Sequence, residues 1–554
     1  MLACPPAVNG GSPRVCIIDD ARRSENFRYA TPMNAPAART GADLLCETLL
    51  AHGVDHCFAN PGTSEMHFVA ALDRQPRMRC VLGLSEGVVT GAADGYARMV
   101  DRPACTLLHT GPGLANGLAN LHNARRAFTP IVNVVGDHAT HHAEHDAPLA
   151  SDIEGLARPM SHWVARSTSA AGLGELAAQA VQQAATPPGR IATLILPANH
   201  AWTPVDAPLP TLRLMPQPQP ARESALAEAL AALRRPGTVL MLAGRALREE
   251  GLVLAARICA TTGVRLLTQQ ANARVERGLG RVMIDRVPYV VGQALESLKD
   301  TRCMVLVGAK APVGFFAYPG KPGSMLPADC PVVVASTPEE DGTAALRELA
   351  ARCGAAADAH RPLLAQRREL PLPSGALTAT TVAQAVVALM PEQAVVCDES
   401  VSSGRDFFPM SWHAAPHDYL QLTGGAIGLG LPLATGAAIA APQRRVISLQ
   451  ADGSAMYTLP ALWTQARERL DIVTVIFSNR SYAILHGEYA QVGAGAPGAN
   501  ARRLFDLAEP ALDWVKLAQG LGVEAARADT AERFGDVFAA ALQRRGPFLI
   551  EAVI

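Results

Sequence analysis

The sequence of 554 residues has little of what marks several classes of protein. Its net charge is only −1, which gives no electrostatic reason to expect binding to nucleic acid or to an anionic membrane. No apolar run approaches the roughly 20 residues of a membrane span. The 11 cysteines include no C-x-x-C pair, a pattern typical of reduced thiols in the cytoplasm. These absences favour a cytoplasmic globular protein.

The composition and the order of apolar runs predict an α/β protein. Hydrophobic residues make up 49% of the chain and charged residues 18%, as in proteins with large buried sheets. Apolar runs that end in glycine or small polar residues alternate with helical patterns. This alternation predicts doubly wound parallel sheets. A chain of this length is expected to hold several domains.

Irregular and proline-rich stretches divide the chain into three folded segments. We call these the first, middle and last segments. The start of the chain is irregular, and Met33 is a second candidate for the true initiator. The predicted divisions are an N-terminal extension at 1–38, the first segment at 39–202, a linker at 203–220, the middle segment at 221–366, a linker at 367–376 and the last segment at 377–554.

Residues 445–485 carry the most informative pattern. An apolar run at 445–449 is followed by a break, a helical pattern, and a second apolar run at 472–477. This is a βαβ unit, which requires parallel strands. Asp452 and Asn479 follow the two strands, at the sheet edge where ligands bind in such folds.

A carboxylate and an amide oxygen at adjacent strand ends suit Mg²⁺, which takes oxygen ligands and shares them with phosphates. Gly453 would let the backbone approach a phosphate, and Ser454 lies at the start of the following helix, where N–H groups are free. Either Asp452 or Asn479 alone is more often an ordinary turn residue. The pair across one βαβ unit is more specific.

The run A-D-G-S, followed by S-N-R-S, resembles the motif of the thiamin-diphosphate-dependent enzymes, a family with acetolactate synthase large subunits and benzoylformate decarboxylases. The resemblance implies that Asp452, Asn479 and the carbonyl of Ser481 bind Mg²⁺, and that Gly453 and Ser454 contact thiamin diphosphate. Ala451 replaces the first glycine of the motif, a small change where no positive φ is needed.

Glu86 follows an apolar run at 79–84 and precedes a helix of small residues. A carboxyl desolvated there is a usable proton partner, and the alternative is a helix N-cap. The run SEGVVTGAADGYAR resembles the family's glutamate segment. The resemblance implies that Glu86 bonds N1′ of the aminopyrimidine and favours the imino tautomer, whose 4′ nitrogen takes the proton from C2 of the thiazolium. The resulting carbanion is the nucleophile.

Thr63 and His109 match one branch of the family. The run FANPGTSE resembles the GNPGS loop of benzoylformate decarboxylase, and LLHTGPGLANG resembles its strand-end histidine. The resemblance implies that Thr63 binds substrate and that His109 exchanges a proton near pH 7. A histidine merely packed at a strand end is the alternative for His109.

Two stretches of the last segment complete the predicted cofactor site. The hydroxyls of Ser402 and Ser403 follow a predicted strand at 393–396 and suit diphosphate oxygens. The run G-G-A-I-G at 424–428 resembles the family's GGLG stretch. The resemblance implies that Ile427 wedges the cofactor into its bent form and that the carbonyl of Gly425 accepts the 4′ amino group.

Two further ligands are considered, a metal ion at a run of histidines and FAD in the middle segment. His138, His141, His142 and His145 would share one face of a helix and bind a metal, although the resemblance favours a polar rim or lid. The middle segment resembles the family's central domain, which binds FAD in acetolactate synthases. Glycine-rich strand ends occur in any doubly wound sheet, so FAD is left open and is not favoured.

The resemblance extends from about Thr40 to the C-terminus. It implies that the first segment is a pyrimidine-binding domain, the middle segment a central domain, and the last segment a diphosphate- and Mg²⁺-binding domain. In the family, the residues that match Glu86 and Asp452 in one site come from different subunits. The resemblance therefore implies a homodimer or homotetramer with its active site at the subunit interface.

The reaction implied is decarboxylation of a small-molecule 2-oxo acid to an enamine, which is then protonated or ligated to a second carbonyl. The V-G-Q-H-Q segment usual in acetolactate synthases is replaced here by residues 399–403. The tryptophan expected after the Asn479 motif is also missing, so branched-chain biosynthesis is disfavoured. His109 and Thr63 favour 2-oxo acid decarboxylation, with or without ligation.

Two alternatives remain open. A CoA-ester lyase or decarboxylase of the same fold would need a basic diphosphate pocket in the middle segment, for which Arg245 and Lys310 are candidates. A degenerate, non-catalytic binding homologue is the second, with Ala451 as its first sign. The retained Glu86, Asp452 and Asn479 argue against it.

Overall fold

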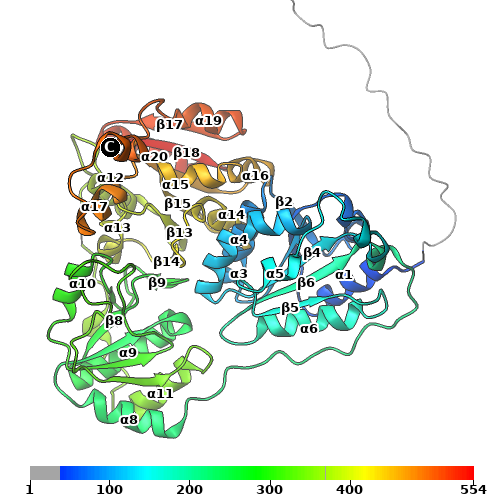
Figure 1. Ribbon diagram of the computed structural model, residues 1–554. Coiled ribbons are helices and arrows are strands. Elements are labelled where there is room, and N and C mark those ends of the chain that lie inside the picture. The colour runs from blue at the N-terminus through cyan, green and yellow to red at the C-terminus, as the bar shows by residue number, and fades with distance from the viewer. Residues whose placement is uncertain (1–37, 369) are drawn as a thin grey trace, which may run out of the picture. The chain divides into compact units, whose positions relative to one another are not determined.

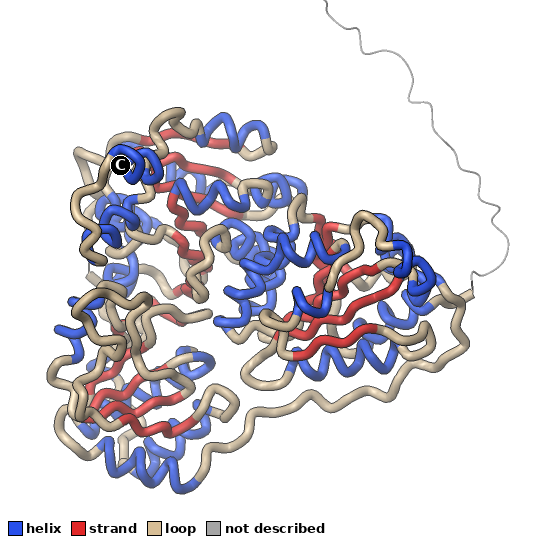
Figure 2. Tube along the Cα trace, viewed as in Figure 1, coloured by secondary structure: helices blue, strands red, loops and turns tan. Residues whose placement is uncertain are grey.

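The computed structural model describes residues 38–368 and 370–554 (Figure 1). Met33 and the predicted extension up to residue 37 lie outside the described residues. From Arg39 to Ile554 the chain forms one compact unit. Three separate sheets lie within it, with helices packed along their strands (Figure 2). The predicted α/β class is confirmed, whereas the predicted domain bounds stay a prediction.

The first sheet has six parallel strands in the order β2-β1-β3-β4-β6-β5. The strand order reverses between β1 and β3, and this switch point is where doubly wound sheets bind ligands. The strands are β1 (His56–Asn60), β2 (Arg79–Leu82), β3 (Ala104–Leu108), β4 (Ile131–Asp137), β5 (Trp163–Arg166) and β6 (Ile191–Pro197). The helices are α1 (Gly41–Ala51), α2 (Met66–Asp73), α3 (Glu86–Val100), α4 (Thr110–Ala127), α5 (Ile153–Ala157), α6 (Leu173–Ala185) and α7 (Ala198–Trp202).

The second sheet has five parallel strands in the order β10-β8-β7-β11-β12. All of them come from the middle segment. The strands are β7 (Thr238–Leu242), β8 (Arg265–Thr268), β10 (Asp285–Arg286), β11 (Cys303–Val307) and β12 (Val332–Ser336). The helices are α8 (Glu223–Leu233), α9 (Glu249–Thr262), α10 (Val291–Leu298) and α11 (Gly342–Arg352).

The third sheet has seven strands in the order β17-β18-β16-β15-β13-β14-β9. The strands are β9 (Val275–Arg277), β13 (Ala394–Glu399), β14 (His417–Gln421), β15 (Val446–Ala451), β16 (Ile472–Ser478), β17 (Glu524–Ala528) and β18 (Phe548–Val553). The helices are α12 (Ala379–Leu389), α13 (Phe407–Met410), α14 (Gly430–Ala440), α15 (Asp452–Ala455), α16 (Ala461–Arg467), α17 (Ala483–Gln491), α18 (Ala499–Phe505), α19 (Trp514–Gly520) and α20 (Ala531–Gln543).

One strand of this sheet departs from the predicted parallel pattern. β9 comes from the middle segment and pairs antiparallel with β14. Arg277 of β9 is fully buried, and its guanidinium lies 3.5 Å from the ring centroids of both Phe408 and Trp412. Arg274, just before β9, pairs with Asp418 at 2.5 Å. These charged contacts attach the middle segment to the last one.

The helical pattern predicted after Asp452 is realised in pieces. Short α15 is followed by the 3-10 turn η6 (Met456–Thr458) and then by α16. Pro460 separates the turn from α16, because proline lacks an N–H group to continue a helix. The observed β15 and β16 confirm the βαβ unit around them.

Small residues let helices α3 and α14 pack closely. A Cβ atom at Gly91 of α3 would lie 2.6 Å from Cγ of Pro432 in α14. A Cβ atom at Gly436 of α14 would collide with the carbonyl oxygen of Ala92. Residues of both helices belong to one hydrophobic core, shared by the first and third sheets. The small-residue helix after Glu86 thus serves to bring the last segment against the first.

None of the helices in the described part of the chain combines the length and the apolarity that crossing a membrane requires. Nine cysteines lie among the described residues, and all of them are free thiols.

Candidate active site

Thr63, Glu86 and His109 lie at the carboxyl ends of three neighbouring strands. β1 pairs with β2 on one side and with β3 on the other. Thr63 follows β1, Glu86 follows β2 and His109 follows β3, so all three lie at the switch point of the first sheet. Thr63 itself is exposed, at the start of the 3-10 turn η1 (Thr63–Glu65).

Glu86 is a buried carboxylate held by amides. It is the first residue of α3, and its carboxylate accepts hydrogen bonds from Asn60 Nδ2 (3.0 Å) and Asn116 Nδ2 (3.2 Å). A Cβ atom at Gly113 would lie 2.9 Å from Oε1 of Glu86, so glycine keeps that side clear. The alternative reading of Glu86 as the N-cap is wrong, because Ser85 caps the helix instead.

His109 is oriented by a buried acid that the sequence reading did not assign. Its Nδ1 lies 2.7 Å from Oε2 of Glu65, which also accepts the N–H of Gly62 at 2.7 Å. Glu65 is fully buried, and this burial raises its pKa although the two hydrogen bonds act in the opposite direction. The His109 side chain is 25% exposed, so the imidazole can reach a ligand while its Nδ1 is held.

Asp452 and Asn479 also lie at the ends of neighbouring strands, β15 and β16. Asp452 is 2% exposed and accepts the N–H groups of Gly453 (2.8 Å) and Arg480 (2.6 Å). The amide oxygen of Asn479 accepts the N–H of Ser481 at 2.9 Å. The structure thus brings the three predicted metal ligands into one hydrogen-bonded loop.

The environment of Asp452 fits a divalent cation. Burial raises the pKa of Asp452, and the backbone N–H groups offset this only in part. Within residues 38–368 and 370–554, no cationic side chain forms an ion pair with it. A buried carboxylate without a counter-charge, beside an amide oxygen and a free carbonyl, matches the oxygen ligands that Mg²⁺ takes.

Gly453 and Ser454, the predicted cofactor contacts, follow Asp452 in the short helix α15. Both are buried in α15. The ring of Tyr482 occupies the space where a Cβ atom of Gly453 would lie, so only glycine fits at this position. Ser402 and Ser403 lie in the turn after β13, which is the strand next to β15. The neighbouring Ser400 hydroxyl donates to Asp398.

A second acid that the sequence reading missed anchors the turn of Gly425 and Ile427. Glu399 is 2% exposed and accepts the N–H groups of Gly428 (2.8 Å), Leu429 (3.2 Å) and Gly430 (2.7 Å). Burial raises its pKa to about 7 in spite of these bonds. An acid at the end of an otherwise apolar strand was the available signal in the sequence.

Helix α4 connects this turn to the Glu86 segment within one chain. Asn120 Nδ2 donates to the carbonyls of Gly87 (2.8 Å) and Gly428 (3.2 Å). Asn123 Nδ2 donates to the carbonyl of Ala426 at 2.7 Å. These bonds join the turn of Gly428 to the start of α3 within a single chain, and a site shared between subunits stays a prediction.

The histidine run does not form the predicted helical metal site. His141, His142 and His145 lie on the 3-10 turn η2 (Thr140–His145), whose residues are exposed, and the half-buried His138 precedes this turn. Among the described residues, no group of three or more His, Cys, Asp or Glu side chains could hold a metal. The metal interpretation of the run is wrong: the ring centroid of His142 lies 5.8 Å from that of His138 and 5.2 Å from that of His145, but the side chains do not converge on one point where a metal could bind.

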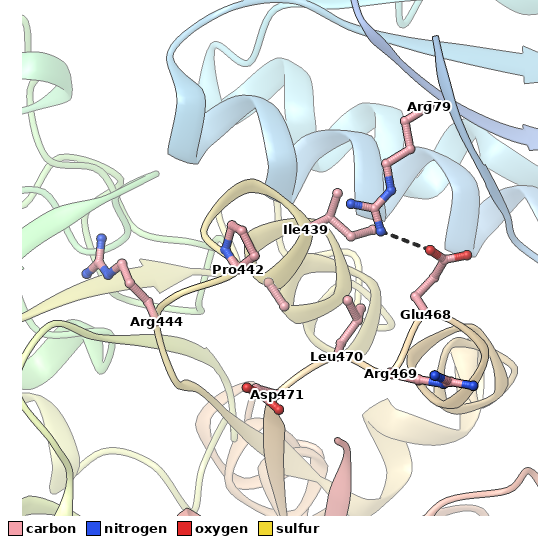
Figure 3. Close-up of a pocket in the computed structure, with 9 residues that line it drawn as sticks. Arg79, Ile439, Pro442, Arg444, Glu468, Arg469, Leu470 and Asp471 are labelled. Carbon is pink, nitrogen blue, oxygen red and sulfur yellow. Dashed lines mark hydrogen bonds and ion pairs between the residues drawn. The ribbon is translucent and has the colours of Figure 1, made fainter. Parts of the chain in front are cut away.

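Two cavities lie near the last segment. One of about 130 Å³ is bordered by the ion pair of Arg79 and Glu468, 3.0 Å apart (Figure 3). It lies at the amino ends of β2 and β16, and none of the predicted site residues lines it. The other, of about 640 Å³, adjoins Ser481, and its remaining lining residues are His486, Arg502, Arg503, Asp506 and Glu509.

The middle segment gives no support to a basic diphosphate pocket. Arg245 lies 3.9 Å from Asp101, whereas the Lys310 ammonium lies 5.8 Å from the ring centroid of Phe128. The two cations thus contact different partners. The structure does not test the binding of FAD, which stays unfavoured.

Two family models match the chain. The N-terminal binding domain of thiamine pyrophosphate enzymes matches residues 39–156, and the C-terminal binding domain matches residues 404–552. The first match lies within the first segment and includes Thr63, Glu86 and His109, and the second lies within the last segment and includes Asp452 and Asn479.

Curated relatives match over nearly the whole chain. The protein IlvX of Mycobacterium tuberculosis, which is named for the acetolactate synthase large subunit, is 48% identical over 525 residues, covering 93% of this chain and 99% of the relative. Benzoylformate decarboxylase of Pseudomonas aeruginosa is 31% identical over 527 residues, covering 91% and 97%.

Solved structures share the fold. The thiamine diphosphate-dependent 4-hydroxybenzoylformate decarboxylase of Rhodococcus jostii has a TM-score of 0.79 at 24% identity and covers 93% of this chain and 99% of its own. Benzoylformate decarboxylase of Polynucleobacter necessarius has a TM-score of 0.77 at 20% identity, covering 93% and 98%.

Proposed function

Because this chain belongs to the thiamin-diphosphate-dependent enzymes, we propose that it releases CO₂ from a 2-oxo acid. The observation that carries the proposal is that two buried acids lie at the same edge of the first sheet, each bonded to its own polar partners. Glu86 lies between Asn60 and Asn116, and Glu65 orients His109. A binding protein without catalysis has no need of either arrangement.

The residues present fit the cofactor. Asp452, Asn479 and the Ser481 carbonyl would hold Mg²⁺, while Gly453, Ser454, Ser402 and Ser403 would face the diphosphate. Gly425 and Ile427 would contact the aminopyrimidine end. Bound thiamin diphosphate supplies a carbon nucleophile that adds to the 2-oxo carbonyl and takes up the electron pair left by CO₂.

The chain's own residues handle the protons. Glu86, buried and bonded by Asn60 and Asn116, would exchange a proton with the aminopyrimidine ring of the bound cofactor. His109, held at Nδ1 by Glu65, presents its other ring nitrogen for delivering a proton to the product. Thr63, exposed beside it, would bind the substrate carboxylate. This arrangement favours protonation, which yields an aldehyde, over ligation to a second carbonyl.

The alternatives have less support. A CoA-ester lyase would need Arg245 and Lys310 to converge, and they contact different partners. A degenerate homologue would not be expected to keep Glu86, Asp452 and Asn479 together with the buried partners of each.

The test is CO₂ release from a panel of 2-oxo acids with thiamin diphosphate and Mg²⁺. We expect release by the parent protein and a loss of roughly a hundredfold or more in Glu86→Gln, because general acid–base groups contribute about 10²–10⁴-fold. Glu524→Gln, an exposed acid at the start of β17, is the matched control. Aldehyde as product identifies a decarboxylase, and an acyloin or acetohydroxy acid identifies a carboligase.

Absence of CO₂ with every acid, or equal release by the parent and Glu86→Gln, would contradict the proposal. We further propose that the enzyme is a cytoplasmic homodimer or homotetramer, with Glu86 and Asp452 of one site on different subunits.

A further inference from the structure

We infer that Phe315 of the middle segment determines substrate specificity, by packing its ring against a flat aromatic side chain of the 2-oxo acid. The inference rests on the proposed function and deepens it. Neither FAD nor another ligand of the middle segment is needed, because this segment would contribute a wall of the site itself.

Phe315 contacts the turn that the cofactor is expected to touch. Its ring occupies the space where a Cβ atom of Gly425 would lie. Gly425 has φ +81°, which few other residues adopt. Its lack of a side chain also leaves the space that the Phe315 ring fills. Asn123 and Glu399 hold the same turn from the other side.

The ring is held in place by neighbouring aromatics. The ring centroid of Phe315 lies 5.6 Å from that of Tyr289 and 5.0 Å from that of Phe316. The Tyr289 hydroxyl donates to Oε1 of Glu488 at 3.2 Å, and the Tyr318 hydroxyl donates to Oε2 at 2.6 Å. Glu488 lies on α17, just after the loop of Asn479 and Ser481.

These contacts connect Phe315 to two parts of the last segment, the turn of Gly425 and helix α17. Burial raises the pKa of Tyr318 to about 12, so its phenol stays protonated and keeps donating to Glu488 at neutral pH. The aromatic residues around Phe315 are therefore held in a fixed position by Glu488. Yet Phe315 is 43% exposed, so part of a preorganised ring remains free to contact a ligand.

An aromatic substrate side chain is the ligand that such a ring recognises. Offset or edge-to-face aromatic pairs are stabilised beyond their buried area by an amount that corresponds to about a two- to tenfold preference. A methyl side chain, as in pyruvate, gains no such contact. The ring thus predicts discrimination by the size and flatness of the group next to the 2-oxo carbonyl.

The test is the ratio of kcat/KM for phenylglyoxylate to kcat/KM for pyruvate. We expect Phe315→Leu to lower this ratio by at least about threefold and Phe315→Tyr to preserve it. Phe548→Leu is the matched control, because Phe548 is a half-buried phenylalanine at the start of β18 and is not among the atoms nearest to Gly425. Retention of thiamin diphosphate in each variant shows that the fold and the cofactor site are intact.

An unchanged ratio in Phe315→Leu would overturn the inference, and so would a ratio that rises because the ring obstructs the pocket. An equal fall in Phe548→Leu would also overturn it. Release of CO₂ with an unchanged ratio leaves the proposed function standing. Absence of CO₂ release from both acids and from the wider panel overturns the function and the inference together.

Discussion

Acidic side chains buried at strand ends are the chemical core of this protein. Glu65, Glu86, Glu399 and Asp452 are each 5% exposed or less. Backbone or side-chain N–H groups donate to each of them, although Oε1 of Glu65 has no hydrogen-bond partner, and no Arg or Lys pairs with them among the described residues. A buried acid without a counter-charge is costly, so each is expected to have a function or to anchor a loop.

Replacement of Glu65 by Gln should uncouple His109 from its support. The amide keeps the size of the side chain but removes the charge that orients the imidazole. We expect kcat for CO₂ release to fall roughly ten- to a hundredfold with a smaller change in KM. Steady-state kinetics checks this, with Glu47→Gln, a partly exposed acid on α1, as control. If His109→Ala lowers kcat and Glu65→Gln does not, the positioning role of Glu65 is excluded.

The affinity for Mg²⁺ should rise with pH because protons compete for Asp452. Burial raises the pKa of Asp452 above its usual 3.8, and only the ionised carboxylate binds the cation. We expect the affinity to increase by up to about tenfold per pH unit below the raised pKa and then to level off. Calorimetric titration with Mg²⁺ and thiamin diphosphate measures this. Asp452→Asn should bind weakly at every pH, and a pH response equal to that of the parent would refute the assignment.

At the scale of elements, the candidate site residues lie at the ends of strands, and helices pack the first segment against the last. β1, β2 and β3 present one group of residues, and β13, β15 and β16 present the other. The packing of α3 on α14 and the amides of α4 attach the first segment to the turn before α14. The turn before α14 is the junction, and Glu399 holds it.

The burial of Glu399, which anchors this turn, should make the free energy of unfolding depend on pH. The folded pKa of Glu399, about 7, lies above the usual 4.5. Between these values the folded chain binds the proton and the unfolded chain does not. The free energy of unfolding should therefore fall as pH rises from 4.5 to 7, by about 1.4 kcal/mol for each pH unit and about 3 kcal/mol over the range.

Urea unfolding between pH 4.5 and 8 measures this dependence. Glu65 and Asp452 contribute in the same direction, because burial raises their pKa values too. We therefore compare slopes: Glu399→Gln should show a shallower decrease than the parent, and Glu524→Gln should match the parent. Identical slopes in Glu399→Gln and the parent would show that the carboxyl of Glu399 stays ionised throughout.

At the scale of the whole molecule, the open question is which subunits contribute to one site. If Glu86 and Asp452 of a site come from different subunits, a mixture of Glu86→Gln and Asp452→Asn proteins should regain activity. Random reassortment of dimers gives about half heterodimers, each with one intact site, and so about a quarter of the parent activity. The two variants are unfolded and refolded together, and CO₂ release is measured.

Each variant refolded alone is the control and should stay inactive. Failure of the mixture to regain activity, with parent protein recovering under the same protocol, would place both residues of a site in one subunit.

The sequence by itself determined the fold class, the cofactor motifs and the positions of Glu86, His109, Asp452 and Asn479. It could do so because buried strands are recognisable in the sequence as apolar runs. Parallel strands place the residues that follow them at one edge of the sheet. The residues that act through long-range contacts had no such signal. Glu65 lies 44 positions from His109, and Tyr289 and Tyr318 lie 199 and 170 positions from Glu488.

Only the tertiary structure decided that β9 joins the third sheet, that Phe315 lies on Gly425, and that Glu399 anchors the turn before α14. It also replaced the supposed helix of histidines with an exposed 3-10 turn. The place of β9 depends on which strand edge of the third sheet is unpaired. The place of Phe315 depends on which glycine leaves room for its ring, and the role of Glu399 depends on which buried N–H groups lack an acceptor. Such conditions arise only when distant segments meet, because local periodicity carries no information about their partners.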